Sequence, residues 1–220
     1  MKSGQHSETR QQILRAALRH FARHGYTATS VKQIVGSARV SKPALYYYFG
    51  DKAGLFQALV DTAHDERFRL IQEAAQRGRT IAEKLEEIVA VIFEYTLQNQ
   101  ELMRLAFATA FTASDNTPGC GKCREKGRRN FEFLRTVMAE AQASGELDSS
   151  LAVDDLAMSI YGQVNSYIVL RLLVPDCPLN RQTAVNLVQL FLKGAAGPSR
   201  KRSKINGAGR SKSRPAVSRN

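Results

Sequence analysis

Hydrophobic residues recur every three to four positions along most of the chain, with polar residues between them. This is the period of an α-helix that buries one face, whereas the strict alternation typical of a half-buried strand is not sustained anywhere. The pattern predicts an all-α fold. The first hydrophobic positions of this pattern are Ile13, Leu14, Ala17, Leu18, Phe21, Val31, Ile34, Val35 and Ala38.

Capping and turn residues divide this periodic sequence into helices. Thr9 with Gln12, and Ser30 with Gln33, have the spacing of a capping box, which pairs free backbone N–H groups at a helix start. Glycine and proline then mark the breaks between elements. Beyond the short early segments, the pattern predicts longer helices at 51–77, 80–98, 100–113, 122–144, 153–173 and 181–194, about nine helices in all.

The segment 30–49 predicts two short helices joined by a tight turn. Lys32, Lys42 and Lys52 recur every ten residues, near the starts of successive helices, where each can reach a phosphate or a base. Tyrosines occupy positions 46–48, and three consecutive side chains spread too far around a helix to be buried together. A helix–turn–helix can also be a simple packing unit, but the lysines and tyrosines together favour DNA binding.

Charge is concentrated at the two ends of the chain. Residues 1–55 carry nine basic and two acidic side chains, net +7, and residues 196–220 carry eight basic side chains and no acid, while residues 56–195 are net −3. A polyanionic partner would therefore meet the ends. No apolar run is long enough for a membrane span, and the first ten residues lack a signal-peptide pattern, so a cytoplasmic protein without a membrane partner is predicted.

The stretch from Thr29 to Leu59 resembles the signature of the TetR-type (TetR/AcrR) transcriptional regulators. It reads Val-x-x-Ile, then Val-Ser-Lys-x-x-Leu-Tyr-Tyr-x-Phe-x-x-Lys, then Leu-Phe. The resemblance implies an N-terminal three-helix DNA-binding domain and a larger helical domain that binds a ligand and dimerises. We therefore expect a flexible arm at 1–8, a helix–turn–helix domain at 9–56, a regulatory and dimerisation domain at 57–195, and a basic disordered tail at 196–220.

The resemblance also implies which side chains meet double-stranded DNA. It places four residues against bases, namely Lys42, Pro43, Ala44 and Tyr46, and six against phosphates, namely Thr29, Ser30, Lys32, Tyr47, Tyr48 and Lys52. One departure is Arg39, which occupies a turn position usually held by glycine. If that position is left-handed, Arg39 bears a strain of about 1 kcal/mol.

The C-terminal half predicts a ligand pocket and a dimer interface. The mix of Phe, Met and Tyr in the middle helices indicates a largely apolar effector, and the ligand-binding candidates are Phe93, Met103, Phe107, Phe111, Phe131, Tyr161 and Asn165. The resemblance assigns the last two helices to a homodimer interface, although they could instead complete the monomer core. The interface candidates are Leu156, Ile160, Val164, Val188, Phe191 and Leu192.

Together these features predict a regulator that binds a palindromic operator as a dimer and releases it when a small molecule binds. Repression is the expected mode, and activation stays open. The alternatives are a non-specific DNA-coating protein that uses the basic tail, and a redox-responsive regulator that uses Cys120 and Cys123. We find no hydrolase, zinc-protease or nucleotide-binding motif, and we predict no enzyme, cofactor or metal.

Overall fold

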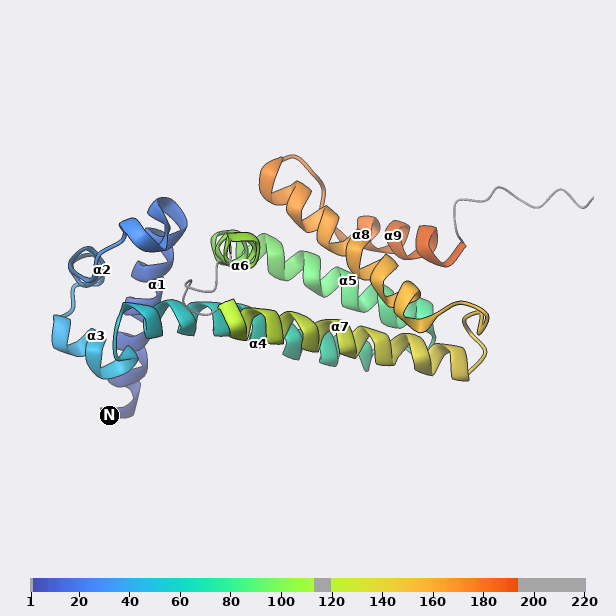
Figure 1. Cartoon of the computed structure of the whole chain (residues 1–220), viewed down its shortest axis with the longest axis horizontal. Helices are drawn as coiled ribbons and strands as arrows, with labels where there is room; N and C mark the ends of the chain where they lie inside the picture. The colour runs from blue at the N-terminus through green and yellow to red at the C-terminus, as the bar shows by residue number, and fades with distance from the viewer. Residues whose placement is uncertain (1, 113–119, 194–220) are drawn as a thin grey trace, which may run out of the picture.

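The computed structural model of the chain describes residues 2–112 and 120–193, with the side chains of residues 6–109 and 124–193. This part of the chain contains nine α-helices and no strand, which confirms the all-α prediction (Figure 1). The helices are α1 (Lys2–Ala28), α2 (Val31–Ala38), α3 (Lys42–Phe49), α4 (Lys52–Ala75), α5 (Ile81–Gln98), α6 (Gln100–Thr112), α7 (Cys120–Ala143), α8 (Val153–Leu173) and α9 (Arg181–Lys193).

The start of the chain differs from the prediction. Helix α1 begins at Lys2, so segment 1–8, expected to be a flexible arm, is helical from its second residue, and the helix does not begin at the Thr9–Gln12 capping box. No proline interrupts these residues, and His6 gains a partner, because its Nδ1 lies 2.8 Å from the hydroxyl of Tyr48. Near the other end, Gly25 (φ +77°) interrupts the regular helix at the glycine expected to end it.

A first hydrophobic cluster joins α1, α2, α3, the beginning of α4 and part of α6. Ile13, Ile34 and Leu45 are fully buried in it, and Phe56 is almost so. The rings of Phe21 and Phe56 meet edge to face, with centroids 5.2 Å apart. This cluster fixes the two short helices of the helix–turn–helix on a rigid support.

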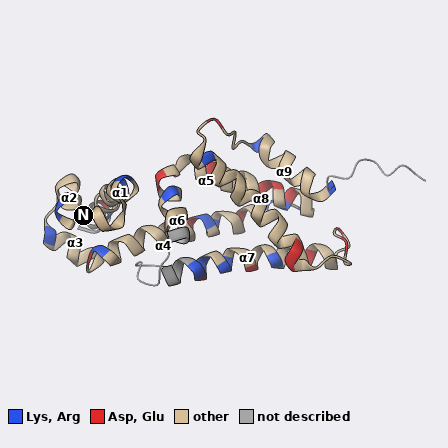
Figure 2. Ribbon diagram, turned by 45° about the horizontal axis from the view of Figure 1, so that its top comes forward, with Lys and Arg blue, Asp and Glu red and all other residues tan. Residues whose placement is uncertain are grey.

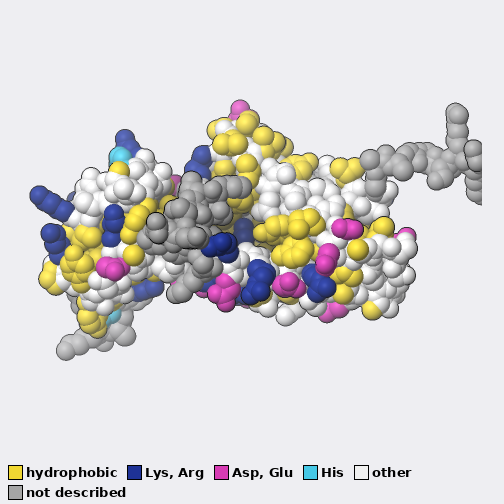
Figure 3. Space-filling model, viewed as in Figure 1, with side chains coloured by type: hydrophobic (Ala, Val, Ile, Leu, Met, Phe, Trp, Pro, Cys, Tyr) yellow, Lys and Arg dark blue, Asp and Glu magenta, His cyan; other side chains and the backbone are white. Residues whose placement is uncertain are grey.

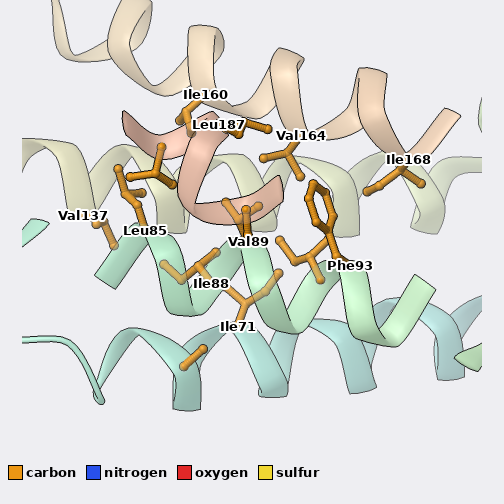
Figure 4. Packing of buried hydrophobic residues seen from close by; sticks show 14 of the residues in the cluster. Ile71, Leu85, Ile88, Val89, Phe93, Val137, Ile160, Val164, Ile168 and Leu187 are labelled. Atoms are coloured by element: carbon orange, nitrogen blue, oxygen red, sulfur yellow. The ribbon is translucent and has the colours of Figure 1, made fainter. Parts of the chain in front are cut away.

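A second, larger cluster lies between α4, α5, α7, α8 and α9 (Figure 4). Each helix contributes residues at helical spacing, so the periodicity seen in the sequence corresponds to the buried faces. No helix in the two described ranges has the length and apolar character needed to cross a membrane. The members labelled in Figure 4 are Ile71, Leu85, Ile88, Val89, Phe93, Val137, Ile160, Val164, Ile168 and Leu187.

Helix α4 is continuous between the two clusters. Ala63 belongs to the first cluster and Ile71, two turns later, belongs to the second. The division expected at residue 57 therefore falls inside a helix that has no break. Helix α6 also links the clusters, since Leu105 packs in the first cluster and Met103 in the second. The two parts of the molecule consequently share two helices.

Candidate DNA interface and ligand pocket

Side-chain caps define the start of each short helix. At α2 the backbone N–H of Ser30 donates to Oε1 of Gln33 at 2.8 Å, and the N–H of Gln33 donates to Oγ of Ser30 at 3.3 Å, so the predicted capping box is confirmed. At α3 the N–H of Ala44 donates to Oγ of Ser41 at 3.3 Å, with Pro43 in the first turn. Both helix starts keep backbone N–H groups at the surface, where phosphates can approach.

The turn between α2 and α3 is held by Arg39. Its backbone is left-handed, with φ 55° and ψ 43°. This conformation lets the N–H of Arg39 donate to the carbonyl of Gly36 at 3.3 Å and the N–H of Val40 donate to the carbonyl of Val35 at 3.1 Å. Arg39 thus ends α2 with the left-handed conformation that glycine usually adopts at this position, and its side chain is exposed.

Helix α3 presents a polar and aromatic face to solvent. Leu45 is fully buried, whereas Tyr46 is 48% exposed and Tyr47 is 75% exposed. Lys42 and Pro43 are also exposed at the start of the helix. Tyr46 and Tyr47 therefore project outward, in agreement with the prediction that the three tyrosines cannot all be buried. Basic residues on α2 and α3 lie at the same end of the molecule (Figure 2).

The third tyrosine of the run is placed differently. Tyr48 is half-buried, and its ring contacts those of His6 and Tyr47, with centroids 6.1 and 5.0 Å away. Ala44 is also half-buried, while Ser30 and Lys32 are exposed. The exposed positions are available for phosphates, and the Tyr48 hydroxyl reaches the surface through its pairing with His6.

Thr29 and Lys52 have inward roles that the sequence did not reveal. Thr29 is 2% exposed, and its hydroxyl donates to the carbonyl of Gly25 at 2.8 Å. The Lys52 ammonium donates to the carbonyls of Tyr26 and Thr29 at 3.1 and 3.0 Å and lies 4.3 Å from the centre of the Tyr26 ring. These contacts tie the start of α4 to the end of α1, so both side chains have structural partners within the protein, and the phosphate contacts expected of them stay predictions.

A narrow cavity lies within the second cluster. Its volume is about 40 Å³. Of the predicted ligand contacts, Tyr161 and Asn165 line it. The full lining is Arg67, Ile71, Leu85, Ile88, Val89, Ile92, Asn130, Phe133, Leu134, Ile160, Tyr161, Val164, Asn165 and Ile168.

Four of the other predicted ligand contacts do not border this cavity. Phe93 and Met103 are each 1% exposed and pack in the core, and Phe93 faces the Tyr167 ring at 6.0 Å. Phe107 and Phe131 are partly buried against the same core. The side chain of Phe111 lies outside the described residues.

Charged side chains cluster where α4 crosses α7. The Lys126 ammonium lies 2.7 Å from carboxylate oxygens of both Asp61 and Asp65, and Arg129 pairs with Asp65 at 2.9 Å. Although burial acts to raise the pKa of Asp65, these hydrogen bonds hold it below its usual range. Burial, followed by the charges of Arg67 and Lys126, lowers the pKa of His64 from 6.5 to about 4. Burial and the neighbouring positive charges therefore favour the neutral form of this histidine.

The last two helices leave an apolar face uncovered, but its members differ from the prediction. Ile160, Val164 and Val188 are buried in the monomer core, because they lie on the inner sides of α8 and α9. Leu156, Phe191 and Leu192 are partly buried against that core. The exposed apolar side chains are Met158, Leu170, Leu173 and Val174 at α8, and Leu190 on α9, and those at the end of α8 form a hydrophobic tip (Figure 3).

The cysteine pair is only partly placed. Cys120 begins α7, so the predicted loop ends there and the pair lies in the first turn of a helix. The side chains of Cys120 and Cys123 lie outside the described residues, as does the basic tail 196–220.

A rigidly supported helix–turn–helix with an exposed polar second helix defines a DNA-binding protein. Residues 13–59 match the family described as bacterial regulatory proteins, tetR family. The chain is 29% identical to the HTH-type transcriptional repressor NicS of Pseudomonas putida, over 66% of this chain and 68% of NicS, and 24% identical to the regulator TtgR of the same species, over 77% and 82%. Over residues 13–59 the chain thus matches the DNA-binding region of the tetR family, and the curated relatives that it resembles over most of its length are transcriptional regulators.

A solved structure shows the same fold over nearly the whole described chain. FadR of Bacillus subtilis, determined in complex with stearoyl-CoA, superposes with a TM-score of 0.69 and 19% identity, covering 84% of this chain and 99% of that one. At this identity the likeness concerns the fold alone.

Proposed function

We propose that the protein is a repressor that binds a palindromic operator as a homodimer and releases it when a small molecule occupies the cavity between α4, α5, α7 and α8. The observation that carries the proposal is the exposed face of α3 on a support that shares α4 with the cavity. Repression as the mode of regulation is supported by the relative NicS, which is named a transcriptional repressor.

At the DNA interface we assign base contacts to the exposed part of α3. Lys42 can donate to guanine acceptors or to a phosphate, and the ring of Tyr46 can pack on a thymine methyl. Pro43 and Ala44 allow the helix start to approach the groove closely. Phosphate contacts fall to Ser30, Lys32, Tyr47 and the Tyr48 hydroxyl, while Thr29 and Lys52 act by fixing the positions of α1 and α4.

Homodimerisation would bring two α3 helices to successive major grooves, about 34–36 Å apart. The exposed apolar face of α8 and α9 supports this arrangement, because a patch of this kind on a monomer marks an interaction site. A two-fold symmetric pair of such faces is self-complementary, and a symmetric dimer matches a palindromic operator.

Release of DNA would follow from the narrowness of the cavity. Because the cavity has a volume of only about 40 Å³, a bound organic molecule has to move the surrounding helices apart. Helix α4 supplies Arg67 and Ile71 to the cavity and also packs in the first cluster. A displacement of α4 would therefore change the separation of the two α3 helices in a dimer. The neighbour FadR was solved with a bound acyl-CoA, which supports a small-molecule effector.

The DNA-binding proposal is tested by selecting binding sites from random duplexes and measuring their affinity by fluorescence anisotropy at fixed salt. A true operator should be a palindrome bound about 10³-fold or more tightly than scrambled DNA. Lys42→Ala should cost about 1–3 kcal/mol on the selected site and change the ranking of base-substituted sites. The matched control Lys84→Ala, on α5, should change neither. An unchanged ranking in Lys42→Ala would refute the base contact, and equal binding to all duplexes would point to DNA coating.

A further inference from the structure

Asn130 of α7 is an unusual side chain in the cavity. It is 6% exposed and lines the cavity between α4, α5, α7 and α8. Neither its Nδ2 nor its Oδ1 has a hydrogen-bond partner within the described part of the protein. Buried polar groups are almost always paired, and an unpaired one destabilises the fold. The Asn130 amide is therefore a group that an incoming ligand can satisfy.

Two other polar side chains of the cavity lining are those of Asn165 and Arg67. Asn165 already uses its amide, because its Nδ2 donates to the carbonyl of Tyr161 at 2.8 Å. Arg67 of α4 brings a positive charge to the lining. The remaining lining residues are apolar apart from Tyr161, so a ligand would meet one amide and one guanidinium in a hydrocarbon surrounding.

Arg67 and Asn130 lie toward the same end of the cavity. Helices α4 and α7 pack against each other and both run away from the helix–turn–helix end (Figure 1). Arg67 precedes Ile71 by one turn on α4, and Asn130 precedes Leu134 by one turn on α7. The polar groups are thus nearer to the DNA-binding cluster, and the hydrocarbon lining continues beyond them.

We propose, building on the ligand-release function above, that the effector is an amphipathic monocarboxylate. Its carboxylate accepts a hydrogen bond from Nδ2 of Asn130 and pairs with Arg67, and its apolar body lies between α5 and α8 against Leu85, Ile88 and Ile160. The Oδ1 of Asn130 can be bridged by a water molecule carried in with the carboxylate.

The electrostatics of this end of α4 agree with an anionic head group. His64 lies one turn before Arg67 and is 8% exposed. The charges around it are Arg67, Lys126 and Arg129, opposed by Asp65, and with burial they lower the pKa of His64 to about 4. Burial is the largest cause of this lowering and disfavours any charge, so the preference for a carboxylate over an amine or an alcohol comes from the positive charge that Arg67 brings to the lining.

The test compares octanoate with 1-octanol, which has the same chain length and no charge, by isothermal titration calorimetry on the full-length protein. We expect octanoate to bind about tenfold more tightly or better, because a charge-assisted hydrogen bond and an ion pair are lost with the alcohol. Asn130→Leu and Arg67→Gln should each weaken octanoate about tenfold and change 1-octanol by about twofold or less.

Thermal unfolding of the ligand-free variants gives a second readout. Asn130→Leu should raise the melting temperature, because it removes an unpaired buried amide, whereas loss of a structural asparagine would lower it. The matched control is Thr96→Val on α5. Thr96 is fully buried, but its hydroxyl donates to the carbonyl of Ile92 at 2.8 Å and it does not line the cavity. Thr96→Val should leave octanoate binding unchanged.

The outcomes separate this inference from the proposed function. Equal affinity for octanoate and 1-octanol, or full octanoate affinity in Asn130→Leu, overturns the assignment of the head group. Failure of both probes to bind overturns it too, while specific operator binding would still stand. Absence of operator selectivity refutes the repressor proposal whatever the calorimetry shows.

Discussion

Arg39 carries the one left-handed backbone among the non-glycine residues of the described chain. It occupies a turn position where glycine is usual, and the sequence predicted strain there if the backbone were left-handed. The φ of 55° confirms the left-handed backbone. The N–H groups of Arg39 and Val40 both donate to carbonyls of α2, and these hydrogen bonds hold the left-handed conformation in place. An arginine at this exposed place adds positive charge beside the DNA-binding helix.

Arg39→Gly should stabilise the fold by about 0.5–1 kcal/mol, since glycine relieves the left-handed strain but also loses more chain entropy on folding. Urea unfolding followed by circular dichroism measures this change. The same variant should lose affinity for all duplexes by a similar factor, because only charge is removed. A lower unfolding free energy in Arg39→Gly would mean that the arginine side chain contributes more than its backbone costs.

At the scale of single elements, helical periodicity was sufficient to predict which segments are helices, and most ends agree within two residues. It could not predict which buried side chains border an empty space. Phe93 and Phe131 were predicted to line the cavity, yet both pack in the core, and the lining combines aromatic residues such as Phe133 with smaller ones such as Val89. Periodicity likewise marks Ile160 as apolar without saying whether the monomer core or a partner covers it.

Thr29 and Lys52 illustrate a second limit of the sequence. Both are polar residues next to helix starts, which favours a phosphate contact on local grounds. The Lys52 ammonium donates to the carbonyls of Tyr26 and Thr29, which precede it by 26 and 23 positions, and the Thr29 hydroxyl donates to the carbonyl of Gly25. Only the packing of α4 against α1 brings these groups together, and no spacing rule in the sequence contains that contact.

Helix α4 also contains the main pH-sensitive group of the core. Since the pKa of His64 is about 4 in the folded protein and 6.5 as a free group, the unfolded chain binds a proton between these values that the folded protein excludes. Stability is therefore complete above pH 6.5 and falls as the pH is lowered. From pH 6.5 to 5 the loss should be about 2 kcal/mol.

His64→Gln should flatten this part of the stability curve, measured by urea unfolding at a series of pH values. Carboxylates with lowered pKa, such as Asp65 and Glu87, act at lower pH, because their stabilisation is lost only as the pH falls below about 4.5. The window between pH 6.5 and 5 thus isolates the histidine. An equally steep loss in His64→Gln would assign the pH dependence to other groups.

At the scale of the whole molecule, an uncovered apolar face lies on α8 and α9, across α5 from α4 (Figure 1). The exposed side chains on it include Met158, Leu170 and Leu190, at 57, 48 and 57% exposure. Small or polar residues separate them along α8, among them Gly162, which meets no atom within 4 Å of an added Cβ. Such a surface allows close approach of a second helix pair.

Leu190→Glu should weaken the homodimer about tenfold or more while leaving monomer stability nearly unchanged, because the side chain is exposed in the monomer and buried only in the dimer. Sedimentation velocity at micromolar concentration measures the association. Leu97→Glu, a partly exposed leucine at the end of α5, is the matched control and should remain dimeric. Monomeric wild-type protein would contradict the dimer proposal outright.

The division of the cavity wall among helices bears on how such a protein could acquire a new inducer. Helix α4, the one that also holds the DNA-binding half, contributes Arg67 and Ile71, whereas α5 and α8 together supply nine of the fourteen lining residues. Recognition can therefore be rewritten on α5 and α8 while the transmitting helix stays intact. A library of variants confined to those two helices is therefore the starting point for a biosensor. The same separation would let relatives bind different effectors while keeping one mechanism of DNA release.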